Sequence, residues 1–456
     1  MKTSPPVIVV VDNGTSYILF LELARIFHTT NAARMIFVTL IESRVAFFKK
    51  NGVEAVFLDL SGNAPGANIA AGQELISTLE IRHSNFRLGL GIKRDRILRL
   101  LPKRRARRIL FSAADPFSKL LDRYQPTLVL GEVSWAIEYL FYYLCINRGI
   151  RYRHILNIPD ESLKITAFDD RHTYATAVEA SPITNDNNSK SGKSYAELCG
   201  DVKSYKISLR NFLRYFRLNY SRNDYRQALF YRLRRVYFPV YKGFNWLFYR
   251  IYSSAMPGTS ASNILFTLHI QPESTPDFVS PFHSDQVQLA KGLLDALRSD
   301  QFLYIKDHPN TISLRKLFTW ARLLRHPQVR LLPREISGNS IYAQFDCVVS
   351  IAGTALLECS KLGVPTLCLS DVYLRELPGV YDARNFPNLA AALTAALAYI
   401  PPKGGNTDEV LRLTTRLGFP GFIHDARVSP LVLDPENIEN LVRLIEHMLE
   451  IAGDQP

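Results

Sequence analysis

The sequence predicts an α/β protein built from two Rossmann-like domains. Short apolar, β-branched segments alternate with amphipathic helical segments, first around 7–60 and again from 263 onward. The length of 456 residues suits two domains of about 200 residues each. A Pro/Gly/Ser-rich stretch at 253–262 separates the two series. We therefore expect a first domain at 1–255 with a basic, aromatic helical insertion at 200–252, a second domain at 262–430, and a C-terminal helix at 434–452 that packs back.

The most informative stretch is 345–369, which reads as strand, glycine turn, short helix and strand. Gly353 permits a sharp turn after the apolar run that ends near Ser350, and Thr354 suits the N-cap of the helix. A helix that begins directly after a parallel strand presents free N–H groups at the sheet edge. The pattern predicts a phosphate site formed by Ser350, Gly353 and Thr354, with Glu358 placed to reach a ribose hydroxyl. In the purely structural alternative, Thr354 only caps the helix and Glu358 only complements its dipole.

Two further strands of the second half also end in polar clusters, and parallel strands bring such ends to one crevice. Lys306 and His308 are suited to neutralising a phosphate or protonating a leaving oxygen, and Pro309 fixes the turn. The other donor-side candidates are Gln271, Glu273 and, for the nucleotide, Arg334.

In the first half, Glu132 follows the apolar segment 127–130 and is expected at the carboxyl end of a parallel strand. A carboxylate there is a candidate general base, and the alternative is a charge that only stabilises the next helix. Asp12 and Asn13 follow the first strand, so we assign them to the acceptor side of a cleft.

The net charge of +13 is concentrated in two segments. Residues 203–250 contain many Lys and Arg and a single acid, Asp224, and 93–108 contains another basic cluster with Asp95. Arg210, Arg214 and Arg217 recur at helical spacing beside an apolar stripe, which is typical of contact with an anionic membrane or an acidic polymer. A solvated helix face is the alternative. No nucleic-acid-binding module accompanies the charge, so we expect no nucleic-acid partner.

The sequence disfavours several other classes. It has no P-loop, no GxSxG elbow and no DxD motif, and its five cysteines lack metal-ligand spacing. We therefore expect no metal and no other cofactor. No apolar run approaches membrane-spanning length, and the start lacks the features of a signal peptide. The expected location is cytoplasmic, peripheral on the inner face of the membrane, with the cysteines as buried thiols.

The segments LHIQPEST, IKDHP and SIAGTALLECSKLGVPTLCL, followed by YLRELPGVY, resemble the bacterial capsule polysaccharide biosynthesis family. That family contains Kdo transferases and is similar in motif layout to bacterial polysialyltransferases. The resemblance covers about 263–385 most strongly, and GEVSWAIEYLFYYLCINRGI extends it into the first half. It implies a GT-B glycosyltransferase whose two Rossmann-like domains face a central cleft. It also implies that His308-Pro309 lies at the nucleotide phosphate. The paired serines of polysialyltransferases are replaced by Gly353-Thr354, which leaves the donor sugar open.

From the residues and the resemblance together we expect a glycosyltransferase that moves a sugar from a nucleotide sugar to a capsule, surface polysaccharide or glycolipid acceptor. The resemblance implies a CMP-activated acidic sugar, such as Kdo or sialic acid, as the donor. The alternatives are a UDP-sugar transferase or epimerase on the same fold, and a non-catalytic GT-B-like protein that assists polysaccharide assembly at the membrane.

Overall fold

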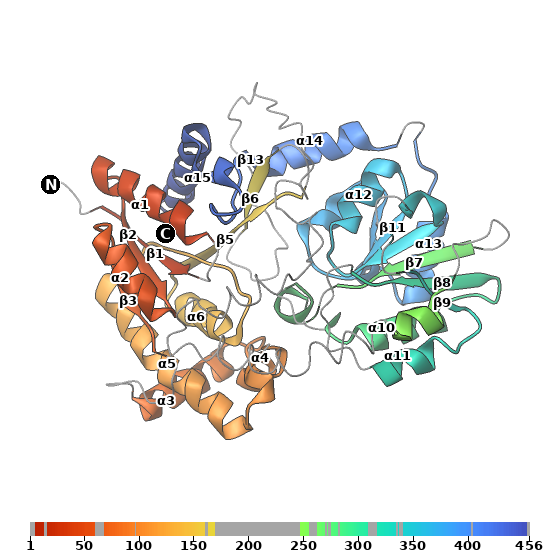
Figure 1. The fold of residues 1–456 in the computed structure, drawn as a ribbon, viewed down its shortest axis with the longest axis horizontal. Coiled ribbons are helices and arrows are strands. Elements are labelled where there is room, and N and C mark those ends of the chain that lie inside the picture. Colours follow the sequence, from red (N-terminus) through yellow and green to blue (C-terminus); the bar gives the residue numbers. More distant parts are fainter. Residues whose placement is uncertain are drawn as a thin grey trace. The chain divides into compact units, whose positions relative to one another are not determined.

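The computed structural model describes residues 5–12, 16–59, 68–95, 97–159, 163–168, 247–254, 262–269, 271, 275–280, 283–308, 317–333, 336, 341–402 and 405–453. Within these residues the chain forms two compact units (Figure 1). Unit 1 contains the described residues up to 168 together with those from 416 onward, and unit 2 contains those from 247 to 415.

Unit 1 is organised around a sheet with the strand order β13-β6-β5-β4-β1-β2-β3. Its strands are β1 (Val7–Asp12), β2 (Arg34–Thr39), β3 (Glu54–Phe57), β4 (Leu128–Leu130), β5 (Arg151–Asn157), β6 (Lys164–Phe168) and β13 (Phe419–Pro420). The first five strands are parallel, whereas β6 and β13 add antiparallel pairings at one edge.

The helices of unit 1 are α1 (Tyr17–Thr30), α2 (Glu42–Lys50), α3 (Ile69–Arg82), α4 (Leu88–Arg94), α5 (Lys103–Tyr124), α6 (Ala136–Ile146) and α15 (Pro435–Gly453). One sheet face, which includes Ile8 and Val10, packs against apolar residues of α1 and α15 in a single core. Leu441 and Ile445 of α15 are fully buried in that core. The C-terminal helix therefore packs back on the first domain, as predicted from the sequence.

Unit 2 contains a parallel sheet with the order β12-β11-β10-β7-β8-β9. Its strands are β7 (Ser262–Thr267), β8 (Gln301–Lys306), β9 (Val329–Leu331), β10 (Cys347–Ser350), β11 (Thr366–Cys368) and β12 (Val380–Asp382). Its helices are α10 (Gln286–Asp295), α11 (Leu317–Leu323), α12 (Ala355–Leu362) and α13 (Leu389–Leu397), while α14 (Thr407–Leu417) crosses the division between the units.

Both faces of the second sheet are buried. Alternate residues of each strand point to opposite sides, so neighbouring residues join different cores. Ile264 and Phe266 of β7 join a core that includes residues of α10, α11 and α13. Leu265, between them, joins a second core with Ala355 and Cys359 of α12. Helices therefore cover both faces of this sheet, which is a doubly wound arrangement.

The strand orders explain where a ligand can bind. Without β13, the strands of unit 1 lie in the order β3-β2-β1-β4-β5-β6. The strands of unit 2 lie in the order β9-β8-β7-β10-β11-β12, which is the same order when they are counted from β7 as the first strand. This is the Rossmann order, and it places a topological switch point beside the first strand of each sheet. The predicted α/β class with two Rossmann-like domains is confirmed by this topology.

The division of the chain corrects the predicted domain boundaries. The second domain was expected to run to 430, but Phe419 and Pro420 pair with β6 of the first sheet. Residues 247–254 were placed in the first domain, but Ser253 bridges to Leu331 and the aromatic side chains of 248, 249 and 252 pack on the core of unit 2. Most of the predicted insertion at 200–252 lies outside the described residues.

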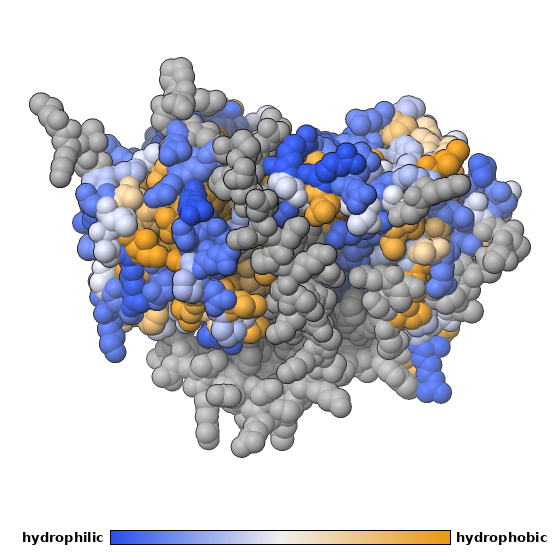
Figure 2. Space-filling view, turned by 90° about the horizontal axis from the view of Figure 1, so that it is seen from above, coloured by the Kyte–Doolittle hydropathy of each residue, from blue (hydrophilic) through white to orange (hydrophobic). Residues whose placement is uncertain are grey.

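The described surface mixes polar and apolar residues. On the face seen in Figure 2, polar residues alternate with small apolar areas over both units. Among the described helices, none combines the length and the apolar character that a membrane span requires.

Candidate functional sites

The turn between β10 and α12 lies at the switch point of unit 2. The N–H of Gly353 donates to the hydroxyl oxygen of Ser350 at 3.2 Å, and the N–H of Ala352 donates to Nε2 of His269 at 3.3 Å. A Cβ on residue 353 would lie 3.0 Å from Ser350 Oγ and 3.3 Å from His269 Cε1. A side chain at this position would therefore be tightly packed against Ser350 and the imidazole of His269. The structure places Ser350 and Gly353 together as predicted and adds His269.

His269 is held from its backbone by a buried glutamine. The amide of Gln286, which is 2% exposed, accepts from the N–H of His269 at 2.8 Å and donates to its carbonyl at 3.1 Å. This pair of bonds fixes the segment that follows β7 against the start of α10. The imidazole is thus positioned at the carboxyl edge of the sheet by groups that are themselves immobilised.

Thr354 and Glu358 form a different arrangement from the predicted one. Thr354 precedes α12, but its side chain makes no capping hydrogen bond to the helix. Its hydroxyl instead bonds the carboxylate of Glu358, which also accepts from Tyr342. Burial raises the pKa of Glu358, while those two hydrogen bonds and Lys361 act against the rise. The N–H groups of Thr354 and Ala355 donate no hydrogen bond to the described residues, so they are available to an anion.

At the end of β8, the predicted Lys306 and His308 lie on either side of a buried aspartate. Nζ of Lys306 donates to the carbonyl of Asp307 at 2.7 Å, and the N–H of His308 donates to Asp307 Oδ1 at 2.9 Å. The hydroxyl of Tyr249 donates to the other carboxylate oxygen at 2.6 Å. Asp307 therefore orients the backbone that carries His308, and it was not among the residues singled out from the sequence.

A second polar cluster lies near the ends of β11 and β12, at the β12 edge of the unit 2 sheet. Nδ1 of His283 lies 3.0 Å from the hydroxyl oxygen of Ser280, which is hydrogen-bonded to that of Ser370. Burial, followed by the charge of Arg384, lowers the pKa of His283. Arg384 in turn pairs with Asp382 at the end of β12. The sequence did not single out these residues.

Other donor-side candidates have structural partners or lie outside the described residues. The side-chain amide of Gln271 donates to Asp277 and to the carbonyl of Ser284, so it braces the loop before α10. Outside the described residues lie Glu273, Pro309 and Arg334 of the donor set, Asn13 of the acceptor set, and the arginines Arg210, Arg214 and Arg217.

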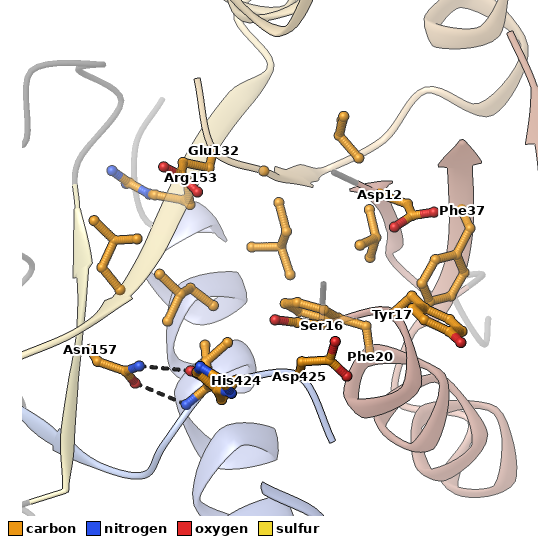
Figure 3. Close-up of a pocket in the computed structure, with 17 residues that line it drawn as sticks. Asp12, Ser16, Tyr17, Phe20, Phe37, Glu132, Arg153, Asn157, His424 and Asp425 are labelled. Atoms are coloured by element: carbon orange, nitrogen blue, oxygen red, sulfur yellow. Dashed lines mark hydrogen bonds between the residues drawn. The ribbon is translucent and has the colours of Figure 1, made fainter. Parts of the chain in front are cut away.

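Unit 1 contains a cavity of about 260 Å³ at its own switch point (Figure 3). The carboxyl ends of β1 and β4 line it, together with β5, the start of α1 and residues 423–425. Asp12, an acceptor-side candidate, and Glu132, the candidate general base, are both among the lining residues. The cavity is near the lower end of the size range for small-molecule sites.

Asp12 is committed to partners within the unit. Its carboxylate accepts from the hydroxyl of Thr39 at 2.8 Å and forms an ion pair with Arg44. The guanidinium of Arg44 lies 4.1 Å from the centre of the Tyr17 ring. Asp12 therefore fixes the wall of the cavity, and proton transfer is better assigned to another group.

Glu132 is half-buried at the mouth of β4, close to an arginine of the next strand. The N–H of Gly131, the residue before Glu132, donates to the carbonyl of Arg153 at 3.1 Å. This hydrogen bond joins the end of β4 to β5 next to Glu132. Arg153 is buried and lines the cavity with Glu132 (Figure 3). The lining of the cavity thus includes a carboxylate that follows β4 and a guanidinium from β5. The sequence predicted only the carboxylate.

The remaining wall comes from the far end of the chain. The amide of Asn157 makes two hydrogen bonds to the backbone of Ile423, at 2.7 and 2.9 Å (Figure 3). This clamp presents His424, whose ring stacks on Phe422, and Asp425, which pairs with Arg427. The hydrogen bond from Arg427 lowers the pKa of Asp425. Nδ1 of His424 is buried without a hydrogen-bond partner among the described residues. No sequence signal linked this segment to the cavity.

The described residues contain no group of three or more His, Cys, Asp or Glu side chains that could hold a metal ion. Four of the cysteines, Cys145, Cys347, Cys359 and Cys368, are buried free thiols, as expected. Burial raises the pKa of each of them. These thiols are therefore core residues.

Comparisons with known proteins give structural likenesses only. No family model matches the chain. No curated protein matches it either. Among solved structures, a glycosyltransferase from Rickettsia africae aligns over 100% of both chains at 11% identity and a TM-score of 0.31. The MnaA–UDP structure from S. aureus covers 99% of each chain at 12% identity and 0.29. A UDP-GlcNAc 2-epimerase from Neisseria meningitidis, bound to UDP-GlcNAc, covers 97% of this chain and 99% of its own at 13% identity and 0.27. Scores this low carry no conclusion, so the fold rests on the strand order.

We expect Gly353→Ala to disturb the turn after β10, because the added methyl group meets both Ser350 and His269. The free energy of unfolding of unit 2 should fall by about 1–3 kcal/mol, measured by chemical denaturation. Gly292→Ala, within α10, is the matched control, because a Cβ there would meet only the side chain of Leu389, at 3.5 Å. Equal stability of the two variants would contradict the packing argument.

Glu358→Gln should make the protein more stable at neutral pH than the parent. A carboxyl group whose folded pKa is raised contributes stability only at low pH, and that contribution is lost as the pH rises through the folded pKa. The advantage of the variant should therefore grow as the pH rises above 4.5, the ordinary value for this group. Thermal unfolding of both proteins across pH 4–8 measures the difference. A constant difference would show that ionisation of Glu358 does not affect stability.

Proposed function

We propose that the protein is a nucleotide-sugar-dependent glycosyltransferase of the GT-B type. The observation that carries the proposal is the repetition of one design, in which two Rossmann-order sheets each place polar groups at the switch point. One of these places offers unpaired N–H groups and cationic side chains, and the other offers a carboxylate in a cavity. An anion-binding place in one unit and a candidate base in the other suit transfer of a group from a phosphorylated donor to a hydroxyl acceptor.

Unit 2 is proposed to bind the donor. Breaking the bond between sugar and nucleotide leaves negative charge on the departing phosphate, which needs donors that are already oriented. The N–H groups of Thr354 and Ala355 at the start of α12 supply them, supported by the dipole of the helix. His308 follows β8 on a chain fixed by Asp307, within the same sheet edge, and is suited to protonating or hydrogen-bonding a phosphate oxygen. Lys306 adds positive charge to this edge.

Unit 1 is proposed to bind the acceptor. Glu132 is the candidate general base for the acceptor hydroxyl, because it is the carboxylate at the end of β4 in the cavity. His424 and Asp425 add hydrogen-bonding groups on the opposite wall, which suits a sugar ring with several hydroxyls. Asp12 shapes the wall of this cavity through its bonds to Thr39 and Arg44, and Asn13 remains a proposed acceptor contact.

The identity of the donor follows from the sequence resemblance alone. It favours a CMP-activated acidic sugar such as Kdo or sialic acid and a capsule or surface-glycolipid acceptor. A UDP-sugar transferase or epimerase on the same fold is the second candidate. A non-catalytic role in polysaccharide assembly is the third. The proposal includes metal-independent transfer at the inner face of the cytoplasmic membrane, with Arg210, Arg214 and Arg217 as one proposed contact.

A thermal-shift screen with CMP, UDP, GDP and ADP tests the donor site. At a nucleotide concentration one hundred times the Kd, binding should stabilise the folded protein by about 2.7 kcal/mol, which raises Tm by roughly 5–10 °C for a unit of this size. A shift with CMP supports the acidic-sugar donor, and a shift with UDP alone transfers the function to the second candidate. If no nucleotide shifts Tm, the proposed donor site in unit 2 is wrong.

Variants of the two catalytic candidates separate donor binding from chemistry. Glu132→Gln should reduce turnover by about 10²–10⁴-fold, the usual contribution of a general base, while the thermal shift with the nucleotide persists. His308→Ala should reduce turnover and also weaken the nucleotide shift. Glu74→Gln on α3 and His28→Ala on α1, which make the same changes at exposed positions, serve as controls. Normal turnover of Glu132→Gln would exclude Glu132 as the base.

A further inference from the structure

A cluster of exposed basic residues surrounds the start of α5 in unit 1. We call Arg99, Lys103, Arg104, Arg105 and Arg107 the basic cluster. All five are exposed, and none forms an ion pair with a described residue. Neither the nucleotide chemistry of unit 2 nor the cavity of unit 1 uses them. They therefore require an explanation of their own.

The position of the basic cluster is unfavourable for the isolated protein. The first turn of α5 contains no acidic residue and receives no side-chain cap. Cations at a helix N-terminus are repelled by the helix dipole. Lys103 and Arg107 are four residues apart and Arg104 and Arg107 three, spacings at which like charges repel on a helix surface. A local arrangement that opposes folding in this way indicates that an external anionic partner stabilises it.

The nearest acidic residue in the sequence does not neutralise this surface. Asp95 is fully buried, and its carboxylate accepts the N–H groups of Ile97 and Leu98, each at 2.8 Å. Its other oxygen accepts from the N–H of Ala136 at 2.9 Å. Asp95 thus joins the end of α4 to the start of α6 and is unavailable to the arginines outside.

Two leucines project beside the basic cluster. Leu90 of α4 is 41% exposed, and Leu100 of the short 3-10 helix η1 (Leu98–Leu100) is 46% exposed. The segments α4 and η1 pack against each other and against α5, so the leucines and the basic side chains share one region. Exposed leucines would not contribute to the binding of a dissolved acidic polymer. A bilayer has both an anionic headgroup layer and an apolar interior that can receive them.

We propose that this surface docks on an anionic lipid bilayer, with the basic cluster against headgroup phosphates and with Leu90 and Leu100 inserted at the interface. The contact is additional to the glycosyl transfer proposed above and does not depend on it. It uses described residues of unit 1, whereas Arg210, Arg214 and Arg217 lie outside the described residues.

Co-sedimentation of the full chain with vesicles tests the proposal. Vesicles of phosphatidylcholine alone are compared with vesicles that also contain phosphatidylglycerol. Each basic residue near an anionic surface contributes about fivefold to affinity, so the combined variant Arg104→Gln, Arg105→Gln and Arg107→Gln should bind anionic vesicles roughly a hundredfold more weakly. Its Tm should be no lower than that of the parent, because repulsion within α5 is relieved.

Two further proteins make the outcomes decisive. The control Lys291→Gln, Arg325→Gln and Arg412→Gln removes the same charge from exposed positions elsewhere and should bind as the parent does. The variant Leu90→Ser and Leu100→Ser should bind vesicles several-fold more weakly while its binding to soluble polyphosphate is unchanged. Unaltered vesicle binding by the arginine variant would overturn the proposal. Loss with the arginine variant but not with the leucine variant would assign the surface to a soluble polyanion and overturn membrane docking.

Discussion

The arrangement of both units depends on the position of the first strand in the middle of each sheet. Because the chain leaves β7 toward β8 on one side and later returns to β10 on the other, the connecting helices diverge at this point and leave the strand ends uncovered. His269 and the Ser350–Gly353 turn occupy that gap in unit 2, and Asp12 and Glu132 occupy it in unit 1. The topology therefore selects which polar residues can reach a ligand before any side-chain chemistry is considered.

The regular elements and the unit 2 turn were predictable from local pattern, because their causes are local. The period of apolar residues identifies strands and helices, and the C-terminal helix expected at 434–452 corresponds to α15. Ser350 and Gly353 meet because they are three residues apart in one turn. His269 was missed, since its contact with Ala352 joins strands that are adjacent only in the folded sheet.

The roles of individual polar residues were harder to predict than their positions. Gln271 and Asp12 lie at strand ends as expected, but internal hydrogen bonds and an ion pair use their side chains. Thr354 precedes α12 as expected, but its hydroxyl serves Glu358 and not the helix backbone. A sequence pattern places a residue at an edge, whereas the choice between bracing and binding depends on partners far along the chain.

Residues 423–425 complete the wall of the unit 1 cavity, and this affects how the protein folds during its synthesis. During synthesis, domains generally fold from the N-terminal end as they emerge from the ribosome. Here the sheet face with Ile8 and Val10 has to wait for α15, and the wall clamped by Asn157 has to wait for Ile423. The core of the N-terminal unit can therefore be completed only after α15 has been synthesised, and until then that sheet face lacks its cover.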